Sequence, residues 1–433
     1  MMVSSMSPAA SIAIVGTGPA GEAAARGCLA HGAAVTVFDE QPRTGGNIDR
    51  VGQTTPATAF EQFCDAHPNA QLLASTRVLS VDSEKCIWFD AGAGAQSRCF
   101  QAVILACGAY DLHDPLPGLP SPAVSSAGAL QALLKGQSIV PAGKIVIAGA
   151  GPFLQVVAAG LLRAGGRVTH VIDRLRFSDY LRLAPWGLGV PINALEFMQT
   201  RWQLLRNGVS VRHGTHVQSV CANTLTTRQG EIIKFDRLGL TERFVPHTQL
   251  ARTAGCELRD DPIGGYWAVN TDTLGRTSQP GIYVIGEGQG IRGWRHARLS
   301  GKRVVASVMA DVIGQVNVAI PGRWRRAFLV GFGRALEHAQ QRRCISPSTP
   351  DAIICPCEGT RLAAVDKAVG LGLADLSSIK VVTRCGMGPC QGRYCEAQVT
   401  DRIRAAGLSP VGALNQQAFT RPLSVAEVIN DSD

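Results

Sequence analysis

Apolar positions near the N-terminus follow the order strand, helix, strand. Ser11–Val15 and Ala34–Phe38 are continuous apolar runs of strand length, and the Ala-rich stretch between them continues to about His31, which is the length of a helix. Strands that alternate with helices in this way form parallel sheets. The pattern therefore predicts the first βαβ unit of an α/β fold.

The same order returns in the middle of the chain. Lys144–Ala148 is another apolar strand, an apolar helix follows to about Ala164, and a further strand runs from Arg167 to Asp173. A chain of 433 residues is long enough to give each unit its own hydrophobic core. We therefore expect two nucleotide-binding domains of the same βαβ design.

A glycine turn follows the first strand, and its residues are Gly16, Gly18, Pro19, Ala20 and Gly21. The first glycine permits a tight turn, the second lets the backbone approach a pyrophosphate, and the third allows close helix–strand packing. The helix N-terminus adds a positive dipole for the phosphates. An acid after the second strand accepts hydrogen bonds from ribose; Asp39 is the first candidate and Glu40 the second.

Two further segments favour FAD over NAD as the ligand of this first unit. Gly45 and Gly46 follow the acid and resemble the glycine pair of the large flavoprotein families, where the backbone passes close to the flavin. Gln101–Tyr110, which contains Gly108, is similar to the segment that returns the chain to the FAD domain in those enzymes. The resemblance implies that these glycines line a flavin site.

Residues Gly281–Gly290 resemble the second FAD motif, a strand that ends in a Gly-Asp pair whose acid binds the ribityl chain. Here Gly286 is followed by Glu287 instead of Asp. The longer side chain can still accept hydrogen bonds from hydroxyl groups. We therefore expect Gly286 and Glu287 to contact the flavin.

The glycine turn of the second unit is incomplete. Gly149 and Gly151 are present, but Leu154 stands where the third glycine belongs, which separates helix and strand. This departure argues against a working NAD(P) site, and a retained domain with an altered nucleotide or with none stays open. The units predict an FAD domain at 9–135 and 263–325, interrupted by an NAD-like domain at 136–262, as in the glutathione-reductase-like plan.

Composition narrows the class of protein further. The chain has 45% hydrophobic and 17% charged residues and a formal charge of +9, but its basic residues are scattered, which argues against nucleic acid as a partner. An anionic cofactor, an acidic partner or a membrane surface explains the charge equally well. Residues 1–10 lack the basic start of a signal peptide, and no apolar run reaches the ~18 residues of a transmembrane helix. We expect a cytoplasmic protein, with a peripheral position at the inner membrane left open.

Cysteines are distributed in two ways. Eight are scattered, and in a reducing compartment we interpret most of them as single buried thiols: Cys28, Cys64, Cys86, Cys99, Cys107, Cys221, Cys256 and Cys344. No redox pair occurs at 47–59 or within the inserted domain, so disulfide reductase chemistry is excluded. The other five fall near the C-terminus: Cys355, Cys357, Cys385, Cys390 and Cys395.

Thiolates on glycine-rich loops are suitable ligands for a [2Fe–2S] cluster, and zinc is the alternative. The segment resembles the bacterioferritin-associated ferredoxin domain, whose Cys-x-Cys pair precedes the next cysteine by roughly 31 to 34 residues. Cys357 is separated from Cys390 by 32 residues and from Cys385 by 27. The resemblance therefore implies Cys355, Cys357, Cys390 and Cys395 as ligands, with Cys385 as a fifth thiol and alternative ligand. This small helical domain spans 351–433, after a linker at 326–350.

From about Ser11 to Arg421 the chain resembles the α (A) subunit of heteromeric bacterial amine dehydrogenases, a group with opine oxidases, D-hydroxyproline dehydrogenase, dye-linked L-proline dehydrogenase and the B-subunit of hydrogen cyanide synthase. The resemblance implies a β subunit of glycine-oxidase type whose FAD oxidises the amine or imino acid, and in some complexes a small γ subunit. It also implies an FMN at the subunit interface and electron flow through this chain to a quinone or redox protein. Its histidines are isolated, so catalytic residues stay unknown.

Two other hypotheses remain open. A self-sufficient NAD(P)H-dependent FAD/[2Fe–2S] reductase would use the second unit to load hydride onto FAD. A scaffold subunit would bind nucleotide without redox chemistry and hold zinc in its cysteines. The amine, the final acceptor and the subunit ratio are not encoded in any motif of this chain.

Overall fold

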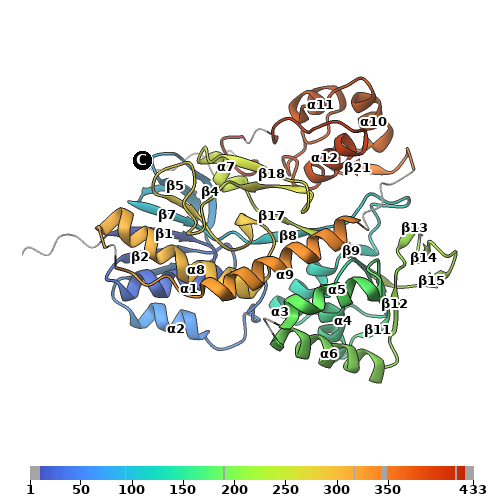
Figure 1. Cartoon of the computed structure of the whole chain (residues 1–433), viewed down its shortest axis with the longest axis horizontal. Coiled ribbons are helices and arrows are strands. Elements are labelled where there is room, and N and C mark those ends of the chain that lie inside the picture. The colour runs from blue at the N-terminus through green and yellow to red at the C-terminus, as the bar shows by residue number, and fades with distance from the viewer. Residues whose placement is uncertain are drawn as a thin grey trace, which may run out of the picture.

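A computed structural model describes residues 10–92, 94–188, 191–315, 317–342, 349–414 and 417–424. Three predicted features lie outside the described residues: the N-terminal residues 1–9, the Ser/Pro part of the linker at 343–348 with Cys344, and the tail at 425–433. Two sheets, each built of parallel strands, lie side by side, and the C-terminal helices pack at one end of the molecule (Figure 1).

The first sheet has five parallel strands in the order β20-β7-β1-β2-β3. Its strands are β1 Ser11–Val15, β2 Ala34–Phe38, β3 Ala70–Leu73, β7 Ala102–Leu105 and β20 Ile282–Val284. The helices α1 Pro19–Ala30 and α8 Trp294–Val308 pack together on one face of it (Figure 1). The predicted strand bounds of the first unit are confirmed, and strand β20, far along the chain, completes the sheet.

The second sheet repeats this design in the order β12-β11-β10-β16-β9. Its strands are β9 Val124–Ser126, β10 Lys144–Gly149, β11 Arg167–Asp173, β12 Ser210–His213 and β16 Arg237–Thr241. Its helices are α3 Ala127–Gln137, α4 Phe153–Arg163, α5 Phe177–Leu188 and α6 Pro191–Arg206, and a smaller sheet contains β13 Val217–Cys221, β14 Thr224–Thr227 and β15 Ile232–Lys234. Both βαβ units predicted from the apolar pattern are therefore present.

The remaining elements before residue 343 lie outside the two sheets. They are α2 Ala59–Ala66, β4 Arg77–Val81, β5 Cys86–Asp90, β6 Ala95–Cys99, β8 Ala109–Leu112, β17 Arg243–Pro246, α7 Gln249–Thr253, β18 Leu258–Asp261, β19 Tyr266–Val269, the 3-10 helix η1 Gly286–Gln289, the π-helix η2 Met309–Ile313 and α9 Arg323–Arg342. The sequence treats 326–350 as a linker, whereas its residues up to Arg342 belong to α9. Leu329 and Glu337 of α9 are buried, so this helix is part of the packed structure.

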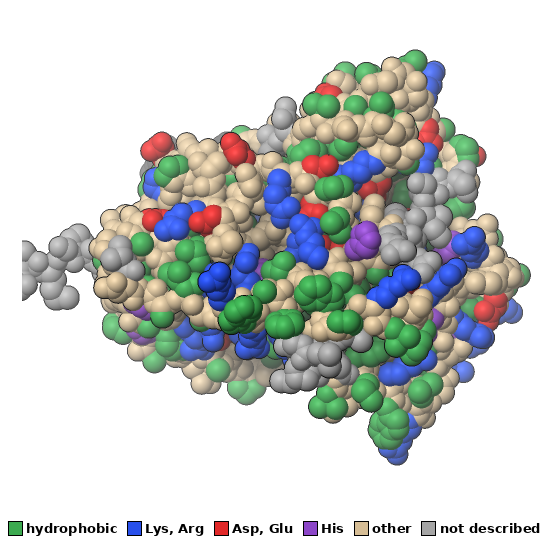
Figure 2. Space-filling view, viewed as in Figure 1, with side chains coloured by type: hydrophobic (Ala, Val, Ile, Leu, Met, Phe, Trp, Pro, Cys, Tyr) green, Lys and Arg blue, Asp and Glu red, His purple; other side chains and the backbone are tan. Residues whose placement is uncertain are grey.

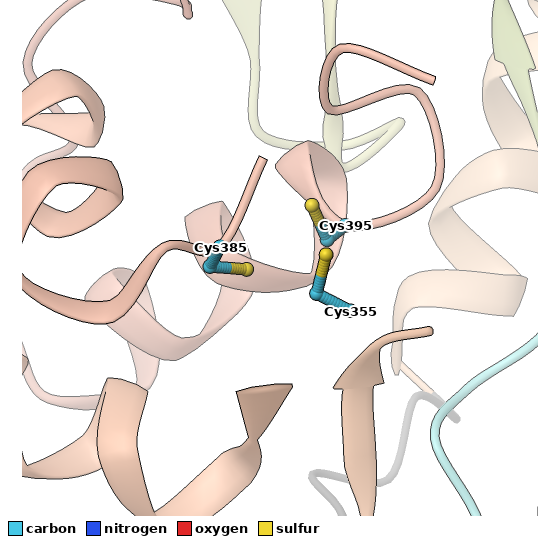
Figure 3. A group of neighbouring side chains, drawn as sticks. All are labelled: Cys355, Cys385 and Cys395. Carbon is cyan, nitrogen blue, oxygen red and sulfur yellow. The ribbon is translucent and has the colours of Figure 1, made fainter. Parts of the chain in front are cut away.

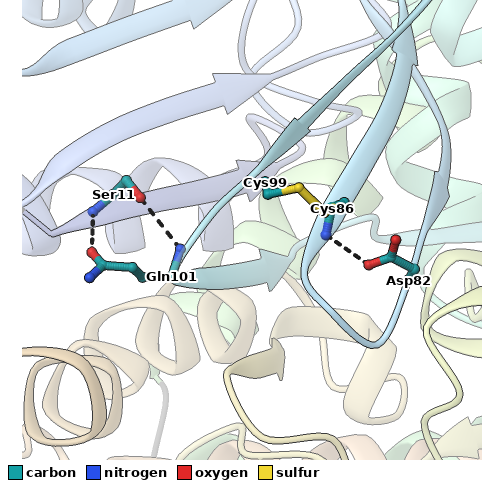
Figure 4. Close-up of a disulfide and its surroundings, with 5 residues drawn as sticks. All are labelled: Ser11, Asp82, Cys86, Cys99 and Gln101. Atoms are coloured by element: carbon teal, nitrogen blue, oxygen red, sulfur yellow. Dashed lines mark hydrogen bonds between the residues drawn. A yellow bond between two sulfur atoms is a disulfide. The ribbon is translucent and has the colours of Figure 1, made fainter.

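One prediction about the scattered cysteines is wrong. Cys86 and Cys99 are not single thiols but form a disulfide between β5 and β6 (Figure 4). The two residues stand directly opposite each other in the antiparallel pair, and the backbone N–H of Cys86 donates to the Asp82 carboxylate over 2.8 Å. Strand register brings them together, and register is not visible when cysteines are considered one at a time.

The C-terminal region has its own core. Its elements are β21 Ile353–Cys355, β22 Thr360–Arg361, α10 Leu362–Gly370, α11 Leu376–Thr383 and α12 Glu396–Ala405, so the helix predicted near 363–369 is confirmed. Buried apolar side chains from these helices meet Trp267 of β19. The C-terminal helices therefore pack against β19.

Candidate functional site

The first glycine turn has the geometry that its spacing predicts. Gly16 has φ +101°, and a Cβ there would lie 2.6 Å from the Ala106 carbonyl oxygen. A Cβ on Gly21 would lie 1.9 Å from the Gly16 carbonyl oxygen. Both positions therefore accept only glycine. Around the Cβ position of Gly18, by contrast, no atom of a described residue outside this stretch of chain lies within 4 Å, so the N-terminus of α1 is open on this side.

Flanking segments converge on this open N-terminus. A Cβ on Gly46 would lie 2.8 Å from the Gly18 Cα, and one on Gly286 would lie 3.1 Å from the Ala20 side chain. The N–H of Gly45 donates to the Thr17 carbonyl over 3.2 Å. Three segments that are far apart in the sequence thus surround a helix N-terminus, the arrangement that binds a pyrophosphate. Gly108, with φ +73°, also leaves its Cβ position open.

The two candidate acids have different surroundings. Asp39 is buried, and its Oδ2 accepts hydrogen bonds from the Thr17 hydroxyl and from the Thr17 N–H at 2.7 Å. Its Oδ1 accepts one from the Gln41 N–H at 2.8 Å. The Glu40 side chain is 60% exposed, and its nearest cation, Arg77, is 3.8 Å away. Asp39 therefore braces the glycine turn, and Glu40 presents a carboxylate to the solvent.

Glu287 lies in η1, beside the turn. Its Oε2 accepts a hydrogen bond of 2.8 Å from the Arg292 N–H. Burial raises the pKa of Glu287 to about 7, although the N–H groups of Arg292 and Gly293 favour the charged form. This carboxyl group can therefore hold or release a proton near neutral pH.

The second glycine turn is covered. Gly149 has φ +141° and packs against Thr241, as a tight turn requires. Gly151 faces α9, because a Cβ there would lie 3.0 Å from the Gln340 Nε2. The same Nε2 donates to the Ala150 carbonyl over 2.9 Å. Leu154 is fully buried. The Gln340 side chain of α9 therefore lies directly against the second glycine turn.

The acid of the second unit is also closed off. Asp173 pairs with Gly149 across β10 and β11, so it corresponds to Asp39, which follows the paired ends of β1 and β2 in the first unit. Its carboxylate accepts hydrogen bonds from the Gly151 N–H at 3.1 Å and the Tyr180 hydroxyl at 2.6 Å, and its side chain is 1% exposed. An acid enclosed in this way has no access to a ribose.

Three of the C-terminal cysteines form one buried group. The sulfur atoms of Cys355, Cys385 and Cys395 lie within 4.8 Å of one another, between the ends of β21, α11 and α12 (Figure 3). Thiol hydrogen bonds from Cys385 and Cys395 lower the pKa of Cys355 to about 2. The backbone N–H of Gly386 also bonds to the Cys355 sulfur, a type of contact that stabilises thiolate ligands.

The remaining two cysteines form a second, more exposed contact. Cys357 is exposed and Cys390 is half-buried, and burial together with the neighbouring Cys390 thiol raises the pKa of Cys357. A Cβ on Gly388 would lie 2.3 Å from the Cys357 Cβ, so this loop also needs glycine. Of the predicted ligands, Cys355 and Cys395 thus lie with Cys385, and Cys357 lies with Cys390. The donor set, five thiols on glycine-rich loops, fits an iron–sulfur cluster or zinc.

Contacts that the sequence did not predict join the cysteine loop to the first unit. Tyr110, two residues after Gly108, donates from its hydroxyl to the Arg393 carbonyl over 2.5 Å. The Tyr110 ring packs on His247 with centroids 4.9 Å apart. Arg252 forms an ion pair of 2.7 Å with Glu396. No motif marks these residues, because the contacts depend on how the two regions pack.

These sites and the fold define the class of the protein: the chain belongs to the pyridine nucleotide-disulphide oxidoreductase family, whose profile matches residues 10–301. Membership implies a flavoprotein oxidoreductase with FAD, and the predicted fold class is confirmed. The A-subunit of opine oxidase from Agrobacterium tumefaciens (strain Ach5) is 31% identical over 459 positions, covering 96% of this chain and 90% of that protein. The resemblance to α subunits of amine dehydrogenases is therefore confirmed.

A second curated relative agrees with this placement, and two solved structures share the fold. Hydrogen cyanide synthase subunit HcnB of Pseudomonas aeruginosa is 29% identical, covering 95% of this chain and 96% of that protein. The solved structure of L-proline dehydrogenase from P. horikoshii has a TM-score of 0.66 at 19% identity, covering 98% of this chain and 81% of that one. T. acidophilum thioredoxin reductase, with a TM-score of 0.51 at 16% identity, covers 70% of this chain and 98% of that one. Among the described helices, none is both long and apolar enough to cross a membrane.

Proposed function

We propose that this chain is the electron-relaying α subunit of a heteromeric amine or imino-acid dehydrogenase of the opine, D-hydroxyproline or proline type. The observation that carries the proposal is the contrast between an open first glycine turn, joined to the cysteine loop through Tyr110, and a covered second turn. The relatives named as subunits support a partner subunit. Such a chain receives electrons from a partner instead of from a nicotinamide cofactor.

The first unit is the proposed FAD site. Gly16, Gly18 and Gly21 would hold the pyrophosphate at the N-terminus of α1, and Glu40 would accept hydrogen bonds from the ribose. Asp39 would keep the turn in place through Thr17. Bound FAD supplies the ability to exchange one or two electrons. The chain's own residues bind and orient it.

The cysteine loop is the proposed one-electron site. We propose a [2Fe–2S] cluster held by Cys355, Cys357, Cys390 and Cys395, with Cys385 as the alternative ligand. The N–H groups that bond to the Cys355 sulfur support an anionic cluster. The proposed complex also contains a β subunit of glycine-oxidase type with its own FAD, an interfacial FMN and, in some members, a small γ subunit. Electrons leave to a quinone or redox protein, from a cytoplasmic site at or near the inner membrane.

The self-sufficient NAD(P)H reductase needs an open second turn. Gln340 bonds to the Ala150 carbonyl and borders Gly151, so this alternative receives no support from the described residues. Rapid bleaching of the flavin after NADH or NADPH is added to the purified chain would overturn the relay proposal. Unchanged flavin absorption under the same conditions is the expected result.

The cluster is tested on anaerobically purified chain. We expect about two irons per chain and the broad visible absorption of a [2Fe–2S] centre. Cys390→Ser should abolish the absorption, whereas the matched variant Cys385→Ser should keep it. The reverse result would show that Cys385, and not Cys390, is the ligand. One zinc per chain without iron would show that the site is structural and does not relay electrons.

The activity itself is tested by co-expression with the flavoprotein encoded beside this chain. The purified complex should reduce a dye acceptor when an opine, D-hydroxyproline or L-proline is supplied. Either protein on its own should transfer far fewer electrons to the acceptor that the complex uses. Full turnover by the partner without this chain, with the same acceptor, would contradict a relay role.

A further inference from the structure

The outer side of α6 exposes a row of large apolar side chains. Leu195, Met198, Trp202 and Leu205 are 56%, 66%, 62% and 57% exposed, respectively. At 3.6 residues per turn these four positions fall within an arc of about 80° around the helix axis. The buried Leu204 lies on a different arc, toward the second sheet. Helix α6 therefore carries a second apolar stripe in addition to the one that anchors it.

Neighbouring helices expose further large apolar side chains. Tyr180 of α5 stacks on Phe197 of α6 with ring centroids 5.2 Å apart, and α5 exposes Phe177 and Leu181 by 65% and 60%. The Trp186 ring packs directly on Gly331 of α9. Helix α9 in turn exposes two aromatic rings. We call the exposed set the helical face: Phe177, Leu181, Leu195, Met198, Trp202, Leu205, Trp324 and Phe328. Figure 2 shows apolar side chains interspersed with basic ones over the surface that α5, α6 and α9 form.

The helical face has the size of a protein interface. A large apolar side chain that is about half exposed offers on the order of 100 Å², so the set offers roughly 800 Å². The largest apolar patches of typical monomers measure about 300–600 Å², and a standard interface buries about 800 Å² on each partner. Tryptophan, phenylalanine and methionine are also enriched in interfaces. A stable protein contact therefore accounts for this surface.

Charges next to the face indicate the chemistry of the partner. The Arg206 guanidinium lies 5.2 Å from the centre of the Trp202 ring. The Arg182 side chain is 63% exposed and lies 3.7 Å from the buried Asp179 carboxylate. Glu196 is engaged by Arg295 in an ion pair of 2.8 Å. The border is therefore basic, and a complementary partner presents carboxylates around an apolar centre.

A lipid surface fits less well. Helices that lie on membranes carry lysine and arginine along their polar arc. The polar arc of α6 contains one arginine, Arg206, beside Glu196, Gln199 and Gln203. This composition favours a protein over an anionic bilayer.

We infer that the helical face is the docking surface for the substrate-oxidising partner subunit, which meets it with an apolar patch bordered by acidic residues. This inference rests on the proposed function, because it needs a partner subunit. It adds the location of the contact: the side of the second βαβ unit that α5, α6 and α9 cover. The covered nucleotide unit thereby has a structural role in assembly.

The test compares surface variants of the full chain, co-expressed with the flavoprotein encoded beside it. The double variant Met198→Glu/Trp202→Glu should bind that partner about 30-fold or more weakly, as expected for interface hot spots. Leu371→Glu is the matched control, because Leu371 is 73% exposed at the end of α10, far from α6 (Figure 1). It should bind like the wild-type chain. Flavin absorption and thermal melting, measured on each chain, should be unchanged.

Charge reversal provides a second, milder variant. Arg182→Glu should weaken binding a few-fold, and the difference from wild type should shrink as salt is raised. Wild-type binding by the double variant would overturn the inference and leave the proposed function intact. A wild-type chain that forms no complex would overturn both. Sedimentation with phosphatidylglycerol vesicles tests the lipid alternative. If the wild-type chain sediments with the vesicles, the double variant does not, and added partner leaves vesicle binding unchanged, the face binds a lipid surface and not the partner.

Discussion

The two βαβ units of this chain have the same backbone design and opposite accessibility. Around the Cβ position of Gly18 in the first turn, no atom of a described residue outside this stretch of chain lies within 4 Å, whereas Gly151 in the second turn lies against Gln340. The acids at matching positions, Asp39 and Asp173, are both buried, but only the first unit adds an exposed carboxylate, on Glu40, whose side chain is 60% exposed. A glycine motif therefore specifies a turn, and whether the turn is a binding site depends on what packs over it.

The largest expected effect comes from giving the first unit the residue of the second. In Gly21→Leu, the side chain would collide with the Gly16 carbonyl, because even a Cβ would lie only 1.9 Å away. The free energy of unfolding should fall by about 3 kcal/mol or more, and most bound flavin should be lost. Urea unfolding and flavin absorbance per chain measure both. Leu154→Gly, the reverse exchange in the second unit, is the control for flavin content. If Gly21→Leu kept flavin at the wild-type level, the third glycine would be dispensable for flavin binding.

The next effect separates the two acids of the first unit. Glu40→Ala should weaken FAD binding by about 10- to 100-fold, because charged hydrogen bonds to ribose are lost. Asp173→Asn, in the second unit, should leave FAD affinity unchanged. Titration of flavin-free chain with FAD, followed by fluorescence quenching, gives both constants. If Asp39→Ala weakened FAD binding without lowering stability, and Glu40→Ala left FAD binding unchanged, Asp39 would be the residue that binds the ribose.

These residues also show how far sequence reasoning extends. Gly16 and Gly21 were predictable, because their role depends on local backbone geometry. The different surroundings of Asp39 and Glu40 were not, because Asp39 is held by a hydrogen bond from Thr17, 22 residues away. Gln340 lies 190 residues from Ala150, and its effect on the second turn depends on tertiary packing.

The cysteines follow the same rule. Their spacing predicts a metal-binding loop, because ligands close in sequence can reach one centre. It does not predict that Cys385 lies in the buried group with Cys355 and Cys395, since that depends on where α11 ends. The pairing of Cys86 with Cys99 was missed for a similar reason, because it depends on strand register.

A pH effect of intermediate size belongs to the open unit. Burial raises the pKa of Glu287 to about 7 from an ordinary value of 4.5, so the folded protein binds this proton more tightly than the unfolded chain. The resulting stabilisation is complete below about pH 4.5 and is lost as the pH rises to about 7. Glu287→Gln, which stays neutral, should therefore have a free energy of unfolding that is about 3 kcal/mol higher, relative to wild type, at pH 8 than at pH 4.5. Urea unfolding of flavin-free chain at the two pH values measures it, and an equal difference at both would show that Glu287 titrates normally.

The smallest expected effect comes from uncovering the second turn. Gln340→Ala removes the hydrogen bond to the Ala150 carbonyl and should lower the free energy of unfolding by about 1 kcal/mol. NADH should still fail to bleach the flavin, because Leu154 continues to separate helix and strand and Asp173 continues to be enclosed by Gly151 and Tyr180. Stopped-flow absorbance with NADH, using Gln341→Ala as the neighbouring control, gives the readout. Rapid bleaching in Gln340→Ala, but not in Gln341→Ala, would mean that one side chain of α9 closes an otherwise intact nucleotide site. The two units would then differ in the side chain that covers the second turn and not in the turn itself.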